Sequence, residues 1–219
     1  MSVKQTLEHT LLKPEASKEQ IIALCNEAKE YQLGGVCINA CHIRTAAEIL
    51  HGSGVKIVTV VGFPLGADRS EVKALAAKLA IADGADEIDM VINIGALKDG
   101  NYELVENDIH AVVEASAKHN VKVIIEACLL TDAEKVKACE LIAKAGAAFV
   151  KTSTGFSSGG ATVHDVKLLA QEAEKYGLGV KAAGGIRNLA TVRAMLDAGA
   201  SRIGTSGGAA IAKEEAAES

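Results

Sequence analysis

Short apolar stretches alternate with longer amphipathic stretches along the whole chain. The short stretches are typical of β-strands, because they are rich in valine and isoleucine and end at glycine or polar residues. Their starts lie roughly 20 to 35 residues apart, which is the spacing of strands joined by crossover helices. The predicted strands are 34–39, 55–62, 86–94, 121–127, 147–152, 179–184 and 202–206.

Helix start and stop signals stand between these strands. Ser17 with Gln20, and Thr131 with Glu134, have the spacing of a capping box. A predicted helix over 18–32 has one apolar face, formed by Ile21, Leu24, Cys25, Ala28 and Tyr31. Glycines typical of helix ends precede three later strands, at Gly84, Gly146 and Gly199.

This repeat predicts a (β/α)8 TIM barrel. The seven strands are one short of eight, and residues 8–12 can supply the missing strand. No linker divides the chain, so we expect a single compact domain over 1–219 with an N-terminal helix. The alternative is an open doubly wound sheet. We favour the barrel because strands 86–94 and 179–184 carry charges, which a barrel can collect at one mouth.

Alternation in strand 86–94 separates an apolar face from a polar face. Helices cover the outside of such a sheet, so the polar face should point into the barrel. The apolar face consists of Ile88, Met90, Ile92 and Ile94, and the polar face of Glu87, Asp89, Val91 and Asn93. The same parity turns Lys151 and Lys181 inward on their own strands, so both should meet Asp89 at one mouth.

Composition narrows the classes of function. A net charge of −5 and an aromatic content of 3% argue against nucleic acid as a partner. No apolar run suits a membrane helix, and residues 1–5 lack the apolar core of a signal peptide. The five cysteines have no CxxC spacing, and the six histidines have no metal-ligand spacing. We therefore expect a cytoplasmic protein with reduced thiols that uses no metal and no cofactor.

Lys151 and Lys181 each close an apolar strand and lead into small residues. Burial and a nearby like charge both disfavour the ammonium form of a lysine. An ordinary lysine is only about 0.04% neutral at pH 7, and a pKa near 7 would increase the reactive amine about a thousandfold. Such an amine can attack a carbonyl carbon. We predict that Lys151 is this nucleophile and Lys181 its like charge; the alternative is two solvated lysines at strand ends.

Acidic side chains on the inner face have two interpretations. Asp89 could carry protons during carbonyl chemistry, directly or through water, or it could be a buried ion-pair partner for a lysine. The residues alone do not separate these two roles. Lys122 and Glu126 could also face inward, and we expect them to form an interior ion pair.

Glycine-rich loops follow the last two predicted strands, at 184–187 and 205–208. In barrels these two loops commonly bind phosphate through backbone N–H groups and a helix N-terminus. The candidate phosphate-binding residues are Gly155, Gly184, Gly185, Arg187, Gly204, Ser206 and Gly207. Further candidate substrate contacts are Thr10, Cys37, Asn39 and Thr152. Cys37 also fits a buried structural thiol, and Asn39 could instead satisfy loop backbone.

The run from Lys151 to Gly155, Lys-Thr-Ser-Thr-Gly, resembles the Schiff-base lysine motif of the 2-deoxyribose-5-phosphate aldolases. Other segments resemble motifs of the same family in the same order, over nearly the whole chain. These segments are 9–14, 36–39, 61–66, 87–93 and 181–187.

The resemblance implies a class I aldolase with a (β/α)8 barrel and no metal. The implied reaction is reversible cleavage of 2-deoxy-D-ribose 5-phosphate to D-glyceraldehyde 3-phosphate and acetaldehyde. Lys151 would form the imine, Lys181 would lower the pKa of Lys151 and join the proton relay, and Asp89 would donate and accept protons. The alternatives are another Schiff-base phosphosugar aldolase, such as a transaldolase-like enzyme, or a non-catalytic phosphosugar-binding barrel.

Three positions depart from the family pattern. Glu8 stands where many members have aspartate, Phe156 where some have a lysine near the phosphate, and Gly207 where some have a second serine. We therefore expect a weaker phosphate grip that depends more on backbone, with Arg187 as the nearby cation. The expected partners are phosphosugar and aldehyde substrates and possible further copies of the chain, with no nucleic acid and no membrane.

Overall fold

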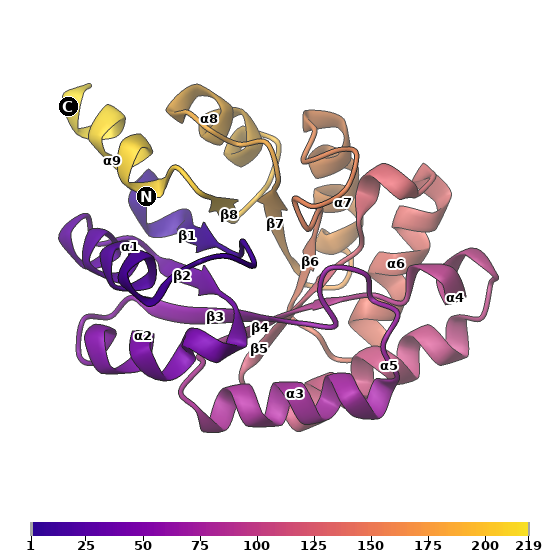
Figure 1. The fold of residues 1–219 in the computed structure, drawn as a ribbon. Helices are drawn as coiled ribbons and strands as arrows, with labels where there is room; N and C mark the ends of the chain where they lie inside the picture. The colour runs from indigo at the N-terminus through magenta and orange to yellow at the C-terminus, as the bar shows by residue number, and fades with distance from the viewer. Residues whose placement is uncertain (1, 219) are drawn as a thin grey trace.

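The computed structural model describes residues 2–218, in which eight parallel strands close into a barrel surrounded by helices (Figure 1). Each strand pairs with the next along the chain, and β8 pairs back to β1. The (β/α)8 barrel is thereby confirmed, and the open-sheet alternative is wrong. The strands are β1 Leu7–Leu11, β2 Gly35–Ile38, β3 Lys56–Val61, β4 Glu87–Val91, β5 Asn120–Ile124, β6 Phe149–Lys151, β7 Gly179–Ala183 and β8 Arg202–Thr205.

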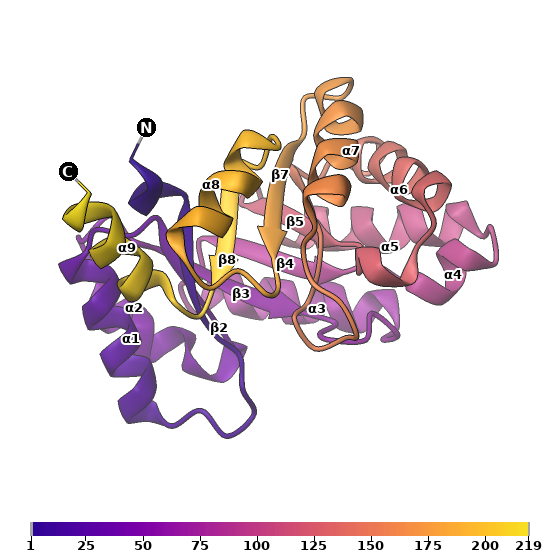
Figure 2. The same cartoon turned by 90° about the horizontal axis from the view of Figure 1, so that it is seen from above.

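Helices follow the strands around the outside of the barrel. They are α1 Lys18–Glu30, α2 Ile43–Leu50, α3 Ser70–Ala82, α4 Ile94–Lys98, α5 Tyr102–Ala115, α6 Asp132–Lys144, α7 Val163–Glu174, α8 Leu189–Asp197 and α9 Gly208–Ala217. Three short 3-10 helices are η1 Val3–Thr6, η2 Ala40–His42 and η3 Ala127–Leu129. Helix η1 is the expected N-terminal helix, and it lies beside α9, so the two chain ends are adjacent (Figure 2). Within residues 2–218, no helix has the length and apolar character needed to cross a membrane.

The local signals for helices act as expected. Both capping boxes form, at Ser17 before α1 and at Thr131 before α6. The predicted apolar face of α1 is buried except at Tyr31, which follows the helix as its C-cap. The glycines after α3, α6 and α8 have φ values of 112°, 83° and 108°, the left-handed conformation that ends a helix.

Two predicted strands are too long at their carboxyl ends. Strand β4 stops at Val91, because Asn93 turns to accept the Ala96 N–H and cap α4. Strand β5 stops at Ile124, because Glu126 adopts a left-handed conformation with φ of 52°. The predicted alternation therefore holds only as far as these breaks.

The faces of β4 are those that the alternation predicts. Ile88 and Met90 are fully buried between the barrel and its helices, in the main apolar core. Glu87 and Asp89 point the other way, into the barrel, where they meet lysines from β5, β6 and β7. The inner face of β4 is thus charged, whereas the layer between the barrel and its helices is apolar.

A buried ion pair between the outer helices fixes the carboxyl end of β4. The Nζ of Lys73 on α3 lies 2.6 Å from Oδ2 of Asp108 on α5, and both side chains are almost completely buried. The same Nζ donates to the backbone oxygen of Val91 at 3.1 Å. Because Val91 is the last residue of β4, this pair holds the carboxyl end of the strand in place.

We expect Lys73→Ala to lower the free energy of unfolding by about 3–5 kcal/mol, because the Asp108 carboxylate would remain buried without its cation. Urea unfolding followed by circular dichroism measures this loss. The control is Arg69→Ala, whose partner Glu71 is exposed and which should change stability by less than about 1 kcal/mol. A loss no greater for Lys73→Ala than for the control would show that the buried pair does not hold the helices.

Candidate active site

Three strands bring Lys151, Lys181 and Asp89 into contact inside the barrel. Lys151 ends β6 and pairs in register with Lys181 on β7, so their side chains lie next to each other. Oδ2 of Asp89 accepts from Lys151 Nζ at 2.8 Å and from Lys181 Nζ at 2.6 Å. Oδ1 of the same carboxylate accepts from Lys122 Nζ on β5 at 3.0 Å. One carboxylate is therefore shared by three lysines.

The charges at this cluster shift the pKa values of its members strongly. Burial alone raises the pKa of Asp89, but the ammonium groups of Lys122, Lys151 and Lys181 outweigh burial and hold that pKa well below its usual range. Burial alone lowers the pKa of Lys181, but the carboxylates of Asp89 and Glu8 outweigh it and raise the pKa far above the ordinary lysine value. Asp89 is therefore an anion and Lys181 a cation at neutral pH.

A second layer of charges lies beneath this cluster, and it corrects one expectation. Lys122 Nζ lies 2.6 Å from Glu87 Oε2 and 3.4 Å from Glu8 Oε1, so the predicted ion pair with Glu126 is wrong. The left-handed turn after β5 directs the Glu126 carboxylate to Thr154 instead. Alternation indicated that Glu87 faces inward, but its partner was not identifiable because pairing across strands depends on register.

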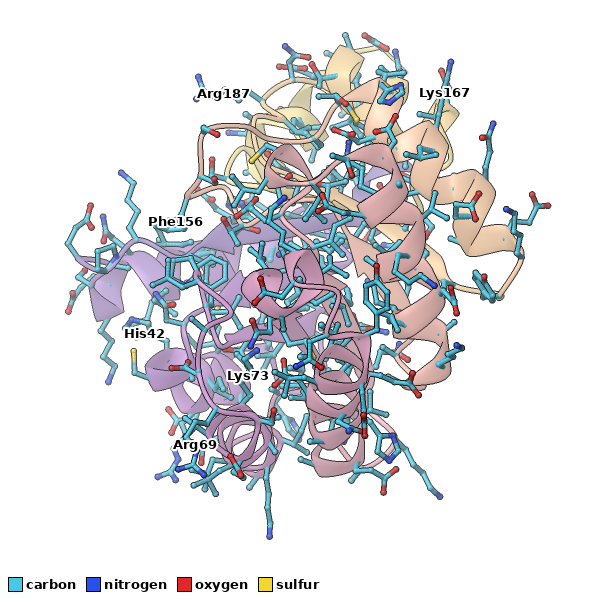
Figure 3. The ribbon with its side chains drawn as sticks, turned by 90° about the vertical axis from the view of Figure 1, so that its right-hand side faces the viewer. His42, Arg69, Lys73, Phe156, Lys167 and Arg187 are labelled. Carbon is cyan, nitrogen blue, oxygen red and sulfur yellow. The ribbon has the colours of Figure 1, made fainter. Side chains whose placement is uncertain are left out.

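A cavity of about 420 Å³ opens above Lys151, at the carboxyl ends of the strands. The Lys151 side chain lines this cavity, whereas Asp89 and Lys181 are fully buried beneath it. Figure 3 shows Phe156 and Arg187 on the same side of the molecule, away from Lys167 on α7. The lining residues are Thr10, Leu11, Leu12, Lys13, Lys151, Thr154, Gly155, Phe156, Ala183, Gly184, Gly185, Ile186, Arg187, Gly204, Thr205 and Ser206.

Six of the seven candidate phosphate residues line the cavity, and Gly207 does not. The Gly207 N–H is already used, because it donates to Thr205 Oγ1 at 3.0 Å. In contrast, the N–H groups of Gly185 and Ser206 have no acceptor within residues 2–218. The structure thus leaves donors free on both loops that the sequence indicated.

Only one of the four further candidate contacts reaches the cavity, and that residue is Thr10. Asn39 donates through Nδ2 to the Leu12 oxygen at 3.2 Å, and Thr152 exchanges hydrogen bonds with the backbone of Ala183 at 3.1 Å. Cys37 is fully buried beside Asp89 and Lys181. These three side chains support the walls of the cavity and do not line it.

Sequence reasoning missed several lining residues. Lys13 brings a cation to the mouth, and Thr154 and Ile186 contribute to the walls. Lys13 belongs to a segment that carried the family resemblance, so its motif was a usable signal. Thr154 and Ile186 also belong to such segments, 151–155 and 181–187, but the residue type of Ile186 gave no further signal, because an apolar residue beside Arg187 could equally pack in the core.

The donor atoms of Glu8, Cys37 and Asp89 lie within 4.8 Å of one another, as metal ligands would. Lysine ammonium groups already contact both carboxylates. Burial raises the pKa of Cys37 to about 11, so the thiol keeps its proton at neutral pH and is a poor ligand. This donor set is suited to holding lysines and does not fit a metal ion.

Comparison with known proteins identifies the family. The model of the DeoC/LacD family aldolases matches residues 3–214. The chain belongs to this aldolase family. A deoxyribose-phosphate aldolase of Streptococcus gordonii is 60% identical over 217 residues, which cover 99% of this chain and 98% of the relative. A tetrameric deoxyribose phosphate aldolase structure from Aeropyrum pernix is 32% identical, has a TM-score of 0.91, and is matched over 99% of this chain and 92% of that one.

Glu8, which departs from the aspartate of many members of this aldolase family, is part of the charge cluster. Its carboxylate contacts Lys181 through Oε2, and its Oε1 lies 3.4 Å from Lys122 and 3.6 Å from Arg202. The longer side chain therefore reaches the second lysine, so the departure does not remove this acid from the site.

We expect the stability contributed by Glu87 to disappear in acid. Burial raises the pKa of Glu87, but Lys122, with help from Lys56 and Arg202, outweighs burial and lowers the pKa from 4.5 to about 2. A depressed folded-state pKa contributes stability above the ordinary value, and that stability is lost as pH falls from 4.5 towards about 2. Urea unfolding of the wild type and of Glu87→Gln at several pH values measures the difference. The two proteins should converge over this window; a constant difference would contradict the prediction.

Proposed function

We propose that this aldolase reversibly cleaves 2-deoxy-D-ribose 5-phosphate to D-glyceraldehyde 3-phosphate and acetaldehyde through an imine on Lys151. The observation that carries the proposal is the position of Lys151, which lines the cavity and whose amine shares one carboxylate oxygen with the buried Lys181. The relative from Streptococcus gordonii and a relative from Geobacillus that is 56% identical are both named deoxyribose-phosphate aldolase, which supports the same substrate.

In the synthetic direction, neutral Lys151 attacks the carbonyl carbon of acetaldehyde and forms a carbinolamine. Loss of water gives the iminium, and loss of a methyl proton gives the enamine. The enamine carbon then attacks the aldehyde carbon of glyceraldehyde 3-phosphate, and the new carbon–carbon bond forms as the aldehyde oxygen takes a proton. Hydrolysis of the resulting imine frees Lys151, and cleavage runs through the same steps in reverse.

Asp89 is the proton carrier in this proposal. Its Oδ2 is within hydrogen-bond reach of Lys151 Nζ, at 2.8 Å, which is the geometry that a general base needs. A carboxylate with a depressed pKa is a weak base while three ammonium groups surround it. Once Lys151 is neutral, only Lys122 and Lys181 remain as cations, so the carboxylate accepts a proton more readily.

Lys181 keeps a positive charge next to the nucleophile. Its raised pKa holds it as an ammonium group, and the shared oxygen of Asp89 places that charge close to Lys151. Because Asp89 Oδ2 contacts both lysines, protons can pass between Lys181 and Lys151 through this carboxylate. Because Lys181 is fully buried, it acts without touching the substrate.

The phosphate is proposed to bind at the free backbone donors after β7 and β8, with two cations at the mouth. Gly185 and Ser206 present N–H groups, and Lys13 and Arg187 line the same cavity. Phe156 adds an apolar side chain there that is 51% exposed and packs edge-on against Phe63, with ring centroids 5.3 Å apart. The phosphate grip therefore depends on backbone and on exposed cations.

Three broader features belong to the same proposal. A single domain is supported by the closed barrel and its continuous core. Self-association is supported by the tetrameric relative and by three exposed apolar side chains on α3, namely Val72, Leu75 and Leu79. A cytoplasmic location is supported by the free state of all five cysteines.

Incubation with acetaldehyde followed by borohydride reduction should label Lys151, because reduction traps its imine as a stable secondary amine. Peptide mapping by mass spectrometry locates the label. Lys151→Leu should abolish the label and nearly all turnover, whereas Asp89→Asn should slow turnover by about a hundredfold or more. A label at any other lysine would overturn the assignment of the nucleophile.

The same experiment separates the alternatives. Trapping with acetaldehyde is expected only if acetaldehyde is the donor substrate, as we propose. A transaldolase-like enzyme would be trapped by a different donor. A non-catalytic phosphosugar-binding barrel would bind the sugar without any trapped adduct. Turnover of Asp89→Asn within about threefold of the wild type would contradict the proton-carrier role.

Phe156→Lys should lower the KM for 2-deoxyribose 5-phosphate by about two- to fivefold, because it adds an exposed cation at the phosphate end of the cavity. The KM for unphosphorylated 2-deoxyribose should not fall, which separates a charge effect from a general one. Steady-state assays of acetaldehyde release measure both values. An equal fall for both sugars would show that the phenylalanine acts on something other than the phosphate.

A further inference from the structure

Glu126 is a buried carboxylate without a cation. It follows β5 at the edge of the barrel, and its side chain is 2% exposed. Among residues 2–218, no lysine, arginine or histidine forms an ion pair with it. Lys122, which the sequence predicted as its partner, instead forms ion pairs with Glu87, Glu8 and Asp89. A buried carboxyl group without a cation beside it needs hydrogen bonds from its surroundings.

Both hydrogen bonds to this carboxylate come from one residue, Thr154. The Thr154 N–H donates to Oε1 of Glu126 at 3.1 Å, and the Thr154 hydroxyl donates to Oε2 in a short hydrogen bond. The Thr154 hydroxyl oxygen in turn accepts the Phe156 N–H at 3.0 Å. A continuous chain of contacts thus runs from Glu126 through Thr154 to Phe156.

The backbone at Glu126 is held in an unfavourable conformation. A residue other than glycine with φ of 52° and ψ of 64° is in the left-handed region, which costs conformational energy. Neighbouring bonds fix this turn, because the Ala127 N–H donates to the Thr152 oxygen at 2.8 Å and the Leu129 N–H to the Glu126 oxygen at 2.9 Å. Such a conformation persists where its surroundings require it, and here it aims the carboxylate at Thr154.

The segment that Glu126 holds forms part of the cavity wall. Thr154, Gly155 and Phe156 all line the cavity, three to five positions after the nucleophile. Gly155 has φ of 84°, and a side chain placed there would meet nothing within 4 Å, so its backbone faces open space. Glu126 orients the Thr154 hydroxyl, and the oxygen of that hydroxyl accepts the Phe156 N–H, so the shape of this wall depends on Glu126 through Thr154.

We propose that Glu126 is a positioning residue that fixes segment 154–156 as the phosphate-side wall of the site. It acts through Thr154 and does not itself reach the substrate. The proposal rests on the proposed function, because it assumes that the phosphate of the sugar lies against Gly155. It predicts that Glu126 governs recognition of the phosphorylated end and leaves imine formation at Lys151 unchanged.

The test compares Glu126→Ala with the wild type on 2-deoxyribose 5-phosphate and on unphosphorylated 2-deoxyribose. We expect KM for the phosphorylated sugar to rise about tenfold or more, because the wall loses its fixed geometry. We expect kcat/KM for 2-deoxyribose, and borohydride trapping of acetaldehyde, to stay within about threefold. Glu140→Ala is the matched control, since Glu140 is on the outer face of α6 and pairs only with Lys137 and Lys144 among the described residues.

Two Thr154 variants test the same link from its other end. Thr154→Val removes the hydroxyl at nearly constant volume and should reproduce the rise in KM, whereas Thr154→Ser keeps the hydroxyl and should recover most of it. If Glu126→Ala fails to fold, as judged by circular dichroism, the Thr154 pair decides the question. Equal losses on both sugars, or no loss in Thr154→Val, would overturn the proposal. Failure of the proposed function is distinct, because the wild type itself would then neither cleave the sugars nor be trapped.

Discussion

The interior of this barrel depends on the mutual neutralisation of buried charges. Glu8, Glu87 and Asp89 face inward, and Lys122, Lys151 and Lys181 contact them with almost no access to water. Charges removed from water are tolerated only when they are paired, and removal of one partner leaves the other exposed to the full cost of burial. The strands must therefore close in the one register that brings these groups together.

This constraint also places the chemistry at one mouth. Lys151 is the lysine of the cluster that lines the cavity, so it is the one that an entering carbonyl compound can meet. Asp89 and Lys181 are fully buried beneath it. Side chains outside this cluster hold the carboxyl ends of β4 and β6. Lys73 donates to the Val91 oxygen at the end of β4, and Glu126 accepts the Thr154 N–H after β6.

The sequence predicted the architecture well because strand and helix signals are local. Alternation turned Glu87 and Asp89 inward, and capping boxes located the starts of α1 and α6. The sequence prediction failed where a single residue left the regular pattern. Asn93 caps a helix and Glu126 adopts a left-handed conformation, so the predicted strands 86–94 and 121–127 were too long. The expected ion pair of Glu126 with Lys122 was wrong for the same reason.

The sequence by itself predicted the barrel, the inward face of β4 and the inward direction of Lys151 and Lys181, and it therefore predicted that these lysines meet Asp89. It could do so because periodicity and residue type are carried by neighbours in the chain. Only the tertiary structure decided which lysine meets the cavity, that Cys37, Asn39 and Thr152 stay behind its walls, and that Glu126 reaches Thr154. These outcomes depend on register and closure between distant strands, which no local pattern encodes.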